Sequence, residues 1–332
     1  MSTKLRVLET LKEKSPAYIS GQELADSLEI SRNSVWKAIK RLQDDGFAID
    51  SKASIGYRLV ESADVLSASV LTDLIVKPCK VYVFDSIDST NTYAKTLDCN
   101  NSVNIVVANE QTKGRGRLGR SFHSPSSKGI YMTIAFEPDF GIDKAMLITS
   151  LTAVAVCKAF EETVGIGPKI KWVNDIYIQE KKVCGILTEA ESNFETGTIS
   201  KIIVGIGINC FEQEFPEDIK EKATYIANPQ KEFERNQLIA TITNKFFELV
   251  DNFDKIRLLR DYKSRSMILG QPILIYGTNQ SALPENGGRG VKARAIDIDE
   301  NGGLVVEYLE GMMSHQMETI TSGEVTIRKD YY

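Results

Sequence analysis

The stretch NIVVANEQTKGRGRLGRSFHSPSSKGIYMTIAFE, residues 104–137, places a loop rich in glycine and arginine between two apolar segments. The segments 104–111 and 130–137 carry many β-branched and aromatic residues, which predicts two buried strands. The loop satisfies the GxGxxG pattern of dinucleotide sites, but it leads into another strand and not into a helix, so the match is weak. Arginines separated by glycines favour a lid that presents positive forks to phosphate or carboxylate. A solvated basic loop or a nucleic-acid-binding arm is the alternative.

Further strands and helices surround this loop. The apolar runs at 80–85, 168–172, 174–178, 182–191 and 199–209 predict strands, and those at 143–164 and 236–253 predict helices. Short turns join successive strands, which indicates a mixed, mostly antiparallel sheet and not a doubly wound parallel one. We assign residues 65–268 to this central domain.

The N-terminal residues 1–62 have the outline of a winged helix-turn-helix. Three short amphipathic segments follow one another, the second opened by the capping-box pattern at Ser20–Glu23 and the third by Ser31, and the alternating run 47–60 predicts a hairpin. Residues 1–60 carry a net charge of +2 and the rest of the chain −7. DNA binding is therefore expected from the outer face of the third helix, although a solvated basic face is the alternative. The residues on that face are Arg32, Asn33, Trp36, Lys37 and Lys40.

The composition changes after Gly270. Short strands at 273–277, 291–299, 304–311 and 324–328 are separated by glycine turns, which predicts a small C-terminal β-barrel over residues 270–332. Residues 61–64 are a candidate linker, and ENGGRG, residues 285–290, is a candidate mobile loop. The expected fold class is α+β with three domains in 332 residues.

Composition excludes several classes of protein. No apolar run reaches the ~18 residues of a membrane span, and the charged N-terminus lacks the apolar core of a signal peptide. Five scattered cysteines, an odd number without a CxxC pair, favour reduced thiols and a cytoplasmic location. Only His123 and His315 are available, which excludes a histidine-rich metal site.

A second polar group follows in Lys171-Trp-Val-Asn-Asp175, where two predicted strands meet. Asp175 has the ligand type for Mg²⁺, although an Asn-Asp pair between strands more often forms a turn. Lys182 starts the next strand, and Gly185 would let a ligand approach the backbone. Gly205 and Gly207 leave one face of a later strand bare, which suits close packing of a ring system or of a helix.

These motifs together closely resemble the biotin–protein ligase family. The resemblance rests on IDSTN (87–91), NEQTKGRGRLGRSFHSP (109–125), KWVND (171–175), KKVCGILTE (181–189) and GIGIN (205–209). With the winged N-terminus, nearly the whole chain resembles the bifunctional ligase and biotin-operon repressor form. The family usually has Pro where this chain has Val173, Trp where it has Phe122 and Arg where it has Leu118.

The resemblance implies roles for individual residues. It assigns biotin binding to Ser89, Thr90, Asn91, Gln111, Arg115, Gly116, Arg117, Lys182, Gly185, Gly205 and Gly207. It assigns nucleotide binding to Arg117, Arg120, Phe122, Asn174 and Asn209, and catalysis to Arg115, Arg117, Asp175 and Lys182. Asp175 is also the candidate Mg²⁺ ligand, and no other protein metal site is expected.

The reaction that the resemblance implies needs no protein nucleophile. Biotin and ATP, both anions, form biotinyl-5′-AMP, and a lysine of a biotin carboxyl carrier protein then takes the biotin. Such chemistry depends on charge neutralisation and alignment. The implied partners are that carrier protein of acetyl-CoA carboxylase or another biotin-dependent carboxylase, biotin operator DNA, and a second copy of the chain when biotinyl-AMP is bound.

Three other functions remain open from the sequence. A lipoate ligase would share the core and the adenylation chemistry but is expected to lack the arginine-glycine lid. A repressor that only senses biotin would not need Arg115, Arg117, Asp175 and Lys182. A structural DNA-binding adaptor would need neither the lid nor the paired glycines 205 and 207.

Overall fold

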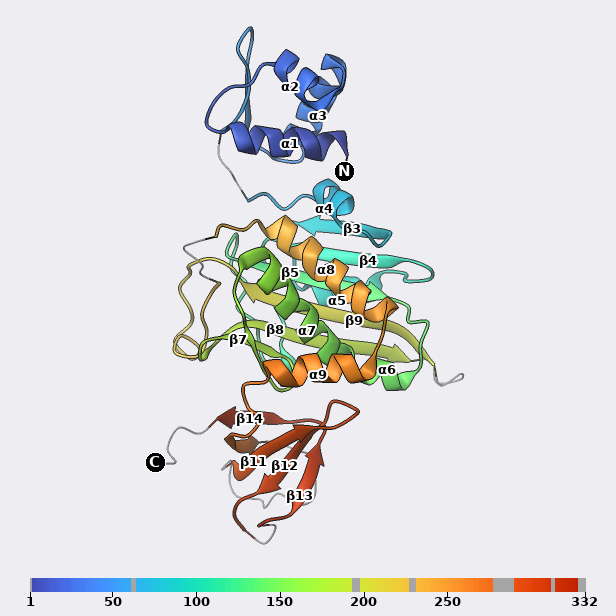
Figure 1. Ribbon diagram of the computed structural model, residues 1–332, viewed down its shortest axis with the longest axis vertical. Coiled ribbons are helices and arrows are strands. Elements are labelled where there is room, and N and C mark those ends of the chain that lie inside the picture. Colours follow the sequence, from blue (N-terminus) through green and yellow to red (C-terminus); the bar gives the residue numbers. More distant parts are fainter. Residues whose placement is uncertain are drawn as a thin grey trace.

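The computed structural model describes residues 2–60, 64–192, 198–226, 231–276, 290–311 and 314–327. They form an N-terminal helical domain, a central sheet with helices and a C-terminal sheet, arranged in a row with the central domain in the middle (Figure 1). The α+β class and the sequence of three architectures are as predicted from the sequence. In the described part of the chain, no helix combines the length and the apolar character needed to span a bilayer.

The N-terminal domain is a three-helix unit with a two-stranded wing. Its elements are α1 (Thr3–Lys14), α2 (Gly21–Leu28), α3 (Arg32–Asp44), β1 (Ile49–Lys52) and β2 (Gly56–Leu59). Ser20 and Glu23 form the predicted capping box, and Ser31 caps α3 by accepting the backbone N–H of Ser34. Apolar side chains of all three helices and the wing, such as Leu8 and Leu42, form one core, which also takes in Val70 of the central domain.

The central sheet has seven strands in the order β3-β4-β5-β9-β8-β7-β6. The strands are β3 (Cys79–Phe84), β4 (Val103–Ala108), β5 (Gly129–Phe136), β6 (Lys169–Lys171), β7 (Asp175–Ile178), β8 (Lys181–Ser192) and β9 (Ile199–Asn209). β3 and β4 run parallel and all other neighbours are antiparallel, as the short turns predicted. The long loop 109–128 leaves the sheet after β4 and returns to it at β5.

Helices cover both faces of this sheet. The central helices are α4 (Ala68–Leu74), α5 (Thr90–Thr96), α6 (Ile142–Met146), α7 (Ile148–Ala159), α8 (Arg235–Asp251) and α9 (Lys255–Arg265). α7 and α8 pack on the face that carries Ile105 and Val107, and α5 packs on the opposite face over Val106 (Figure 1). This split follows from the alternation of side chains along a strand. The helix predicted at 143–164 is divided at Leu147, and a π-helical turn, Phe160–Val164, ends it.

The C-terminal strands form an antiparallel sheet. Its strands are β10 (Pro272–Tyr276), β11 (Val291–Ile298), β12 (Leu304–Tyr308), β13 (Met317–Ile320) and β14 (Glu324–Ile327), and the order is β13-β12-β11-β10-β14. In the described residues β13 and β14 lie at opposite edges, so the sheet is open where the sequence suggested a closed barrel. The indole N–H of Trp172 donates to the carbonyl of Gly302 at 2.9 Å and ties this domain to the central one. The loop predicted at 285–290 lies, apart from Gly290, outside the described residues.

Arg235 joins Asp64, at the end of the predicted linker, to the central sheet. Its side chain is 3% exposed at the start of α8. The guanidinium pairs with Asp64, the last residue of the predicted linker, and donates to Asn109 Oδ1 and to the carbonyl of Gly129, both at 3.0 Å. Asn109 directly follows β4 and Gly129 begins β5, so both lie at the base of the loop 109–128. Residues 61–63 of the predicted linker lie outside the described residues.

Candidate functional site

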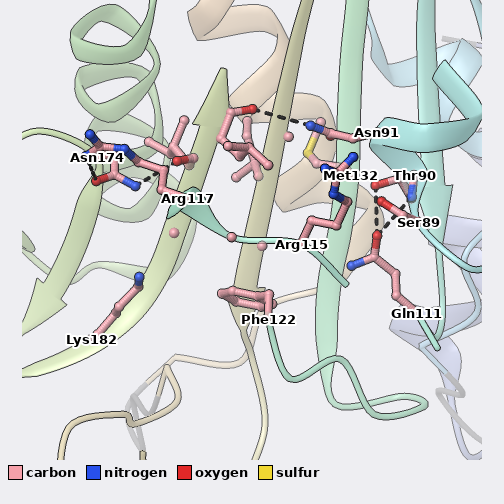
Figure 2. Close-up of a pocket in the computed structure, with 17 residues that line it drawn as sticks. Ser89, Thr90, Asn91, Gln111, Arg115, Arg117, Phe122, Met132, Asn174 and Lys182 are labelled. Carbon is pink, nitrogen blue, oxygen red and sulfur yellow. Dashed lines mark hydrogen bonds between the residues drawn. The ribbon is translucent and has the colours of Figure 1, made fainter. Parts of the chain in front are cut away.

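A pocket opens on the central sheet where β5, β8 and β9 meet the loop 109–128. It encloses about 470 Å³, including its open mouth. The residues that line it are Ser89, Thr90, Asn91, Gln111, Arg115, Gly116, Arg117, Phe122, Met132, Asn174, Lys182, Gly185, Ile186, Leu187, Gly205, Ile206 and Gly207. All eleven residues that the resemblance assigned to biotin are among them. Figure 2 shows the uncharged polar side chains gathered at one end and Lys182, Arg117 and Asn174 at the other.

The uncharged end is built by the start of α5. Ser89 is buried at the N-cap of this helix, yet its side chain makes no capping hydrogen bond, which leaves the hydroxyl available to a ligand. The backbone N–H of Thr90 donates to Gln111 Oε1 at 2.9 Å, and Gln111 Nε2 donates to Ser124 Oγ at 3.1 Å. Because Gln111 is held at both ends of its amide, its oxygen has a fixed position beside Thr90.

The floor of the pocket is made by glycines. A Cβ on Gly205 would lie 2.3 Å from Asn91 Oδ1, and one on Gly207 would lie 2.6 Å from the Phe122 ring. A Cβ on Gly185 would come within 3.1 Å of Lys182 Nζ. Bare backbone is therefore required at Gly205 and Gly207 by the side chains that already cross the sheet, whereas at Gly185 the flexible end of Lys182 can move aside. Apolar walls come from Met132, Ile186, Leu187 and Ile206, which the sequence analysis did not assign to the site.

The arginine-glycine loop folds back on itself over the pocket. The N–H of Gly116 donates to the carbonyl of Arg120 at 2.7 Å, and the N–H of Phe122 donates to that of Gly114 at 2.9 Å. Arg115 is exposed, while Arg117 is half-buried and donates to Asn174 Oδ1 at 3.0 Å. Asn174 Nδ2 in turn donates to the carbonyl of Ile186 at 2.8 Å, so Arg117 is anchored to β8 through this amide.

The charged end places Lys182 beside Asp175. Lys182 Nζ and Asp175 Oδ1 form an ion pair at 2.6 Å, in a geometry that leaves this buried oxygen without a directed hydrogen bond. Burial lowers the pKa of Lys171, and the nearby Asp175 and Glu324 carboxylates oppose that shift. Asp175 does not line the pocket itself but lies behind Lys182. Among the described residues no group of three histidine, cysteine or acidic side chains could hold a metal ion.

Two predicted nucleotide residues lie at the edge of the site. Arg120 is exposed, outside the pocket lining, and donates to Glu324 of β14 at 3.0 Å. This hydrogen bond lowers the pKa of Glu324 and joins the lid to the C-terminal domain. Asn209 also lies outside the lining, where its Nδ2 donates to the carbonyl of Thr224 at 3.0 Å. Sequence reasoning missed Glu324 because it lies about 200 positions from its partner.

The candidate DNA-binding residues lie together on the outside of α3. Arg32, Asn33, Trp36, Lys37 and Lys40 are all exposed. Trp36 is 51% exposed, and Lys40 Nζ lies 5.5 Å from its ring centre. The sequence left open whether Trp36 packs under the wing, and its exposure places it on the outer face.

Comparisons with known proteins agree along the whole chain. An HTH domain model matches residues 3–58, the biotin/lipoate A/B protein ligase family model matches 83–209, and a biotin protein ligase C-terminal domain model matches 283–328. The bifunctional ligase/repressor BirA of Bacillus subtilis is 35% identical over 320 residues, which is 92% of this chain and 94% of the relative. BirA of Escherichia coli is 25% identical, over 93% of this chain and 92% of its own length.

Solved structures give the same result. The biotin protein ligase from Aquifex aeolicus in complex with biotin and ATP superimposes with a TM-score of 0.60 at 28% identity, covering 76% of this chain and 99% of that one. The biotin and ATP in that structure are ligands of the Aquifex protein. The chain matches helix-turn-helix, ligase and C-terminal domain models and is 35% identical to a bifunctional ligase/repressor over 92% of its length, so it belongs to the family of bifunctional biotin ligases and repressors.

Proposed function

We propose that the protein activates biotin as biotinyl-5′-AMP and transfers the biotin to a lysine of a biotin carboxyl carrier protein. The observation that carries this proposal is the division of one pocket into two ends. At one end Ser89, Thr90 and Gln111 offer hydrogen bonds to a cyclic urea, and at the other Arg117 and Lys182 offer positive charge to a carboxylate and a phosphate. Arg115 lies on the side of Thr90 and Gln111 (Figure 2). The glycines 185, 205 and 207 line the pocket between the two ends.

Adenylation forms one bond and breaks another. A carboxylate oxygen of biotin attacks the α-phosphorus of ATP, and the bond from that phosphorus to the bridging oxygen breaks to release pyrophosphate. Negative charge accumulates on the phosphoryl oxygens in the transition state. Arg117 and Lys182 stabilise this charge from fixed positions, because Asn174 anchors the first and the ion pair with Asp175 orients the second.

The nucleotide is expected at the mouth of the pocket, against Phe122, Asn174 and Arg120, with Asn209 holding the adjoining segment 224–226 in place. Mg²⁺ would enter with ATP. Asp175 is a single carboxylate, and Mg²⁺ commonly takes one or two carboxylates together with substrate phosphates. The donor set therefore fits an ion carried mainly by the triphosphate, with Asp175 as its protein ligand.

Transfer completes the cycle. The uncharged amine of the acceptor lysine attacks the acyl carbon of biotinyl-AMP, the bond to the phosphate oxygen breaks, and AMP leaves as the amide forms and the amine loses a proton. The acceptor that fits is the carrier domain of acetyl-CoA carboxylase or of another biotin-dependent carboxylase.

Pyrophosphate release tests the proposal directly. The protein with biotin, ATP and Mg²⁺ should release pyrophosphate until the site is filled, and it should continue when carrier protein is added. Lipoate in place of biotin should give no release, which separates this function from that of the lipoate ligases covered by the same family model. A repressor that only senses biotin would bind biotin and release nothing.

Substituting Gly205 by alanine should weaken biotin binding by about 10- to 100-fold, the range expected for overpacking at a rigid position. The new Cβ would overlap Asn91 Oδ1 at 2.3 Å, so Asn91 must leave its position at the uncharged end. Titration calorimetry with biotin measures the change. Gly141→Ala is the matched control, because a Cβ there meets nothing within 4 Å. Parental affinity in Gly205→Ala would show that Asn91 does not contribute to the pocket.

The N-terminal domain is proposed to bind biotin operator DNA. One recognition helix reads too few base pairs to select a single genomic site, so two copies on paired half-sites are required. We propose that biotinyl-AMP favours this dimer by ordering the lid loop. When carrier protein consumes the intermediate, the monomer predominates and the biotin genes are transcribed. By linkage, whatever favours the dimer must also tighten binding of biotinyl-AMP.

Deleting residues 1–60 should abolish operator binding while pyrophosphate release stays measurable, because the core of the N-terminal domain is separate from the pocket. Selection from a random duplex pool by the parent protein supplies the DNA probe. Gel-shift titration and sedimentation with and without biotinyl-AMP then measure binding and assembly on the same samples. Tight operator binding by the unliganded monomer would contradict the switch but not the ligase function.

A further inference from the structure

A chain of polar side chains runs from the surface of the sheet to the uncharged end of the pocket. Glu189 of β8 accepts a hydrogen bond from Asn91 Nδ2 at 3.0 Å. Asn91 Oδ1 lies 2.7 Å from the hydroxyl of Thr133 of β5, and that hydroxyl lies 2.8 Å from Thr90 Oγ1. Thr90 lines the pocket, while Glu189 and Thr133 do not.

The carboxylate of Glu189 fixes the orientation of the Asn91 amide. Burial disfavours its ionised form, but hydrogen bonds from Lys95 and Asn91 outweigh burial, and the pKa of Glu189 lies below its usual value. An ionised carboxylate only accepts hydrogen bonds, so the NH₂ group of Asn91 must face it. The amide oxygen of Asn91 therefore faces Thr133.

Each of the two hydroxyls has one proton to donate, and their oxygens lie 2.8 Å apart. The amide oxygen of Asn91 cannot donate, so the Thr133 proton must point to it. The contact between Thr133 and Thr90 must consequently be donated by the Thr90 hydroxyl. With its proton turned towards Thr133, Thr90 Oγ1 keeps a lone pair free on the pocket side.

Gln111 supplies a second acceptor at the same place. Its Oε1 is fixed by the Thr90 backbone N–H and lies 3.1 Å from Thr90 Oγ1. The Thr90 hydroxyl is within donating distance of this oxygen too, but its contact with Thr133 is shorter, at 2.8 Å, and would have no proton if Thr90 donated to Gln111. With the proton turned to Thr133, two acceptor oxygens, Thr90 Oγ1 and Gln111 Oε1, stand next to each other. Such a pair is stabilised by a donor that lies between them, and the N–H of a cyclic urea is a donor of this kind.

We propose that Glu189 is a positioning residue for biotin recognition, which sets the direction of the hydrogen bonds through Asn91 and Thr133 so that Thr90 accepts a ureido N–H. The inference rests on the proposed function and adds a specificity device to it. A ligand with oxygen or sulfur in place of that N–H would meet two acceptors and be rejected. The dithiolane ring of lipoate has no N–H, so the same device excludes it.

Glu189→Gln tests the proposal because glutamine keeps the size and can donate. With a donor at position 189, only the long 3.5 Å hydrogen bond from Asn91 Nδ2 to the carbonyl of Leu187 still orients the Asn91 amide, so the proton of Thr90 is held towards Thr133 less strongly. We expect biotin to bind about tenfold more weakly, the cost of one hydrogen bond left unmade. The KM for ATP and the kcat at saturating biotin should stay within about twofold of the parent.

A ligand analogue distinguishes recognition from packing. Two cyclic carbamates, each with one ureido N–H of biotin replaced by oxygen, are titrated against the parent and Glu189→Gln. For each protein, the Kd of a carbamate divided by the Kd of biotin gives its carbamate ratio. The parent should have a large ratio for one of the two carbamates, and Glu189→Gln should have a clearly smaller one. An equal loss of affinity for biotin and both carbamates would mean that Glu189 only supports packing, and parental affinity for biotin would also overturn the proposal.

Two further variants complete the design. Lys95→Met removes the cation on the other oxygen of Glu189, 2.7 Å away, but keeps the Asn91 hydrogen bond, so its carbamate ratio should match the parent. A ratio as small as that of Glu189→Gln would assign the effect to the ion pair and overturn the relay. Thr133→Val keeps the shape and breaks the relay in its middle, and it serves if Glu189→Gln does not fold. Absence of biotin binding by the parent would instead contradict the proposed function.

Discussion

Replacing Lys182 by methionine should lower the rate of adenylation by about 10²- to 10³-fold, the effect of removing one preorganised donor from a transition state. Lys182 Nζ lines the pocket at its charged end, and the backbone of Lys182 is fixed on both sides. Its N–H donates to the carbonyl of Lys222 at 2.8 Å, and its carbonyl accepts from Thr224 at 2.9 Å. We therefore expect the ammonium group of Lys182 to be in position before the transition state forms.

The measurement is single-turnover formation of biotinyl-AMP at saturating biotin and ATP. Biotin affinity should change little, because the ring and urea bind at the other end of the pocket. Lys181→Met is the matched control, an exposed lysine one position earlier on the same strand. Near-parental turnover by Lys182→Met would reduce Lys182 to a structural partner of Asp175.

Substituting Arg117 by glycine should shorten the lifetime of bound biotinyl-AMP far more than it weakens biotin binding. We expect the lid to close over the α-phosphate, which biotin alone lacks, and Arg117 is the lid side chain hydrogen-bonded to Asn174. Loss of one charged hydrogen bond costs about 1.5–3 kcal/mol, which corresponds to about 10- to 150-fold in the release rate. Arg115→Gly should act in the same direction and more weakly, because Arg115 is exposed.

Release is followed with radiolabelled biotinyl-AMP in a chase experiment. The released mixed anhydride should also biotinylate lysines of an unrelated protein such as serum albumin. Lys113→Gly removes an exposed cation near the start of the same loop and is the control. Equal lifetimes of the intermediate in Arg117→Gly and the parent would disprove the lid assignment.

The fold could be predicted where the pattern of apolar residues or a capping residue indicates a helix or a strand. Ile105, Val106 and Val107 form a continuous apolar run, the pattern of a strand buried on both faces, and all three are buried in β4. Ser20 and Ser31 identified two helix starts of the N-terminal domain through capping chemistry. The helices α4 and α9 were not identified. The openness of the C-terminal sheet depends on long-range pairing, which local sequence does not encode.

The pocket was predictable where residue type reveals chemistry. Glycines and arginines in GRGRLGR, and Lys182 beside Gly185, are unusual enough in their positions to attract attention. The apolar walls at Met132 and Ile206 were not, because an apolar residue in a strand has the same pattern whether it faces a ligand or a helix. Thr133 gave one signal that could have been used, a small polar residue among the large apolar and aromatic ones of the strand IYMTIAFE.

The Arg235 contacts decide where the chain can be divided. The guanidinium is buried, and Asp64 is the carboxylate with which it pairs. A ligase fragment beginning after Asp64 would leave that cation without its anion, at a cost of about 3–5 kcal/mol, whereas a fragment beginning at residue 61 would keep the pair. The same condition applies when DNA-binding domains are exchanged between relatives. The junction must lie before Asp64, because Asp64 is part of the folded ligase domain.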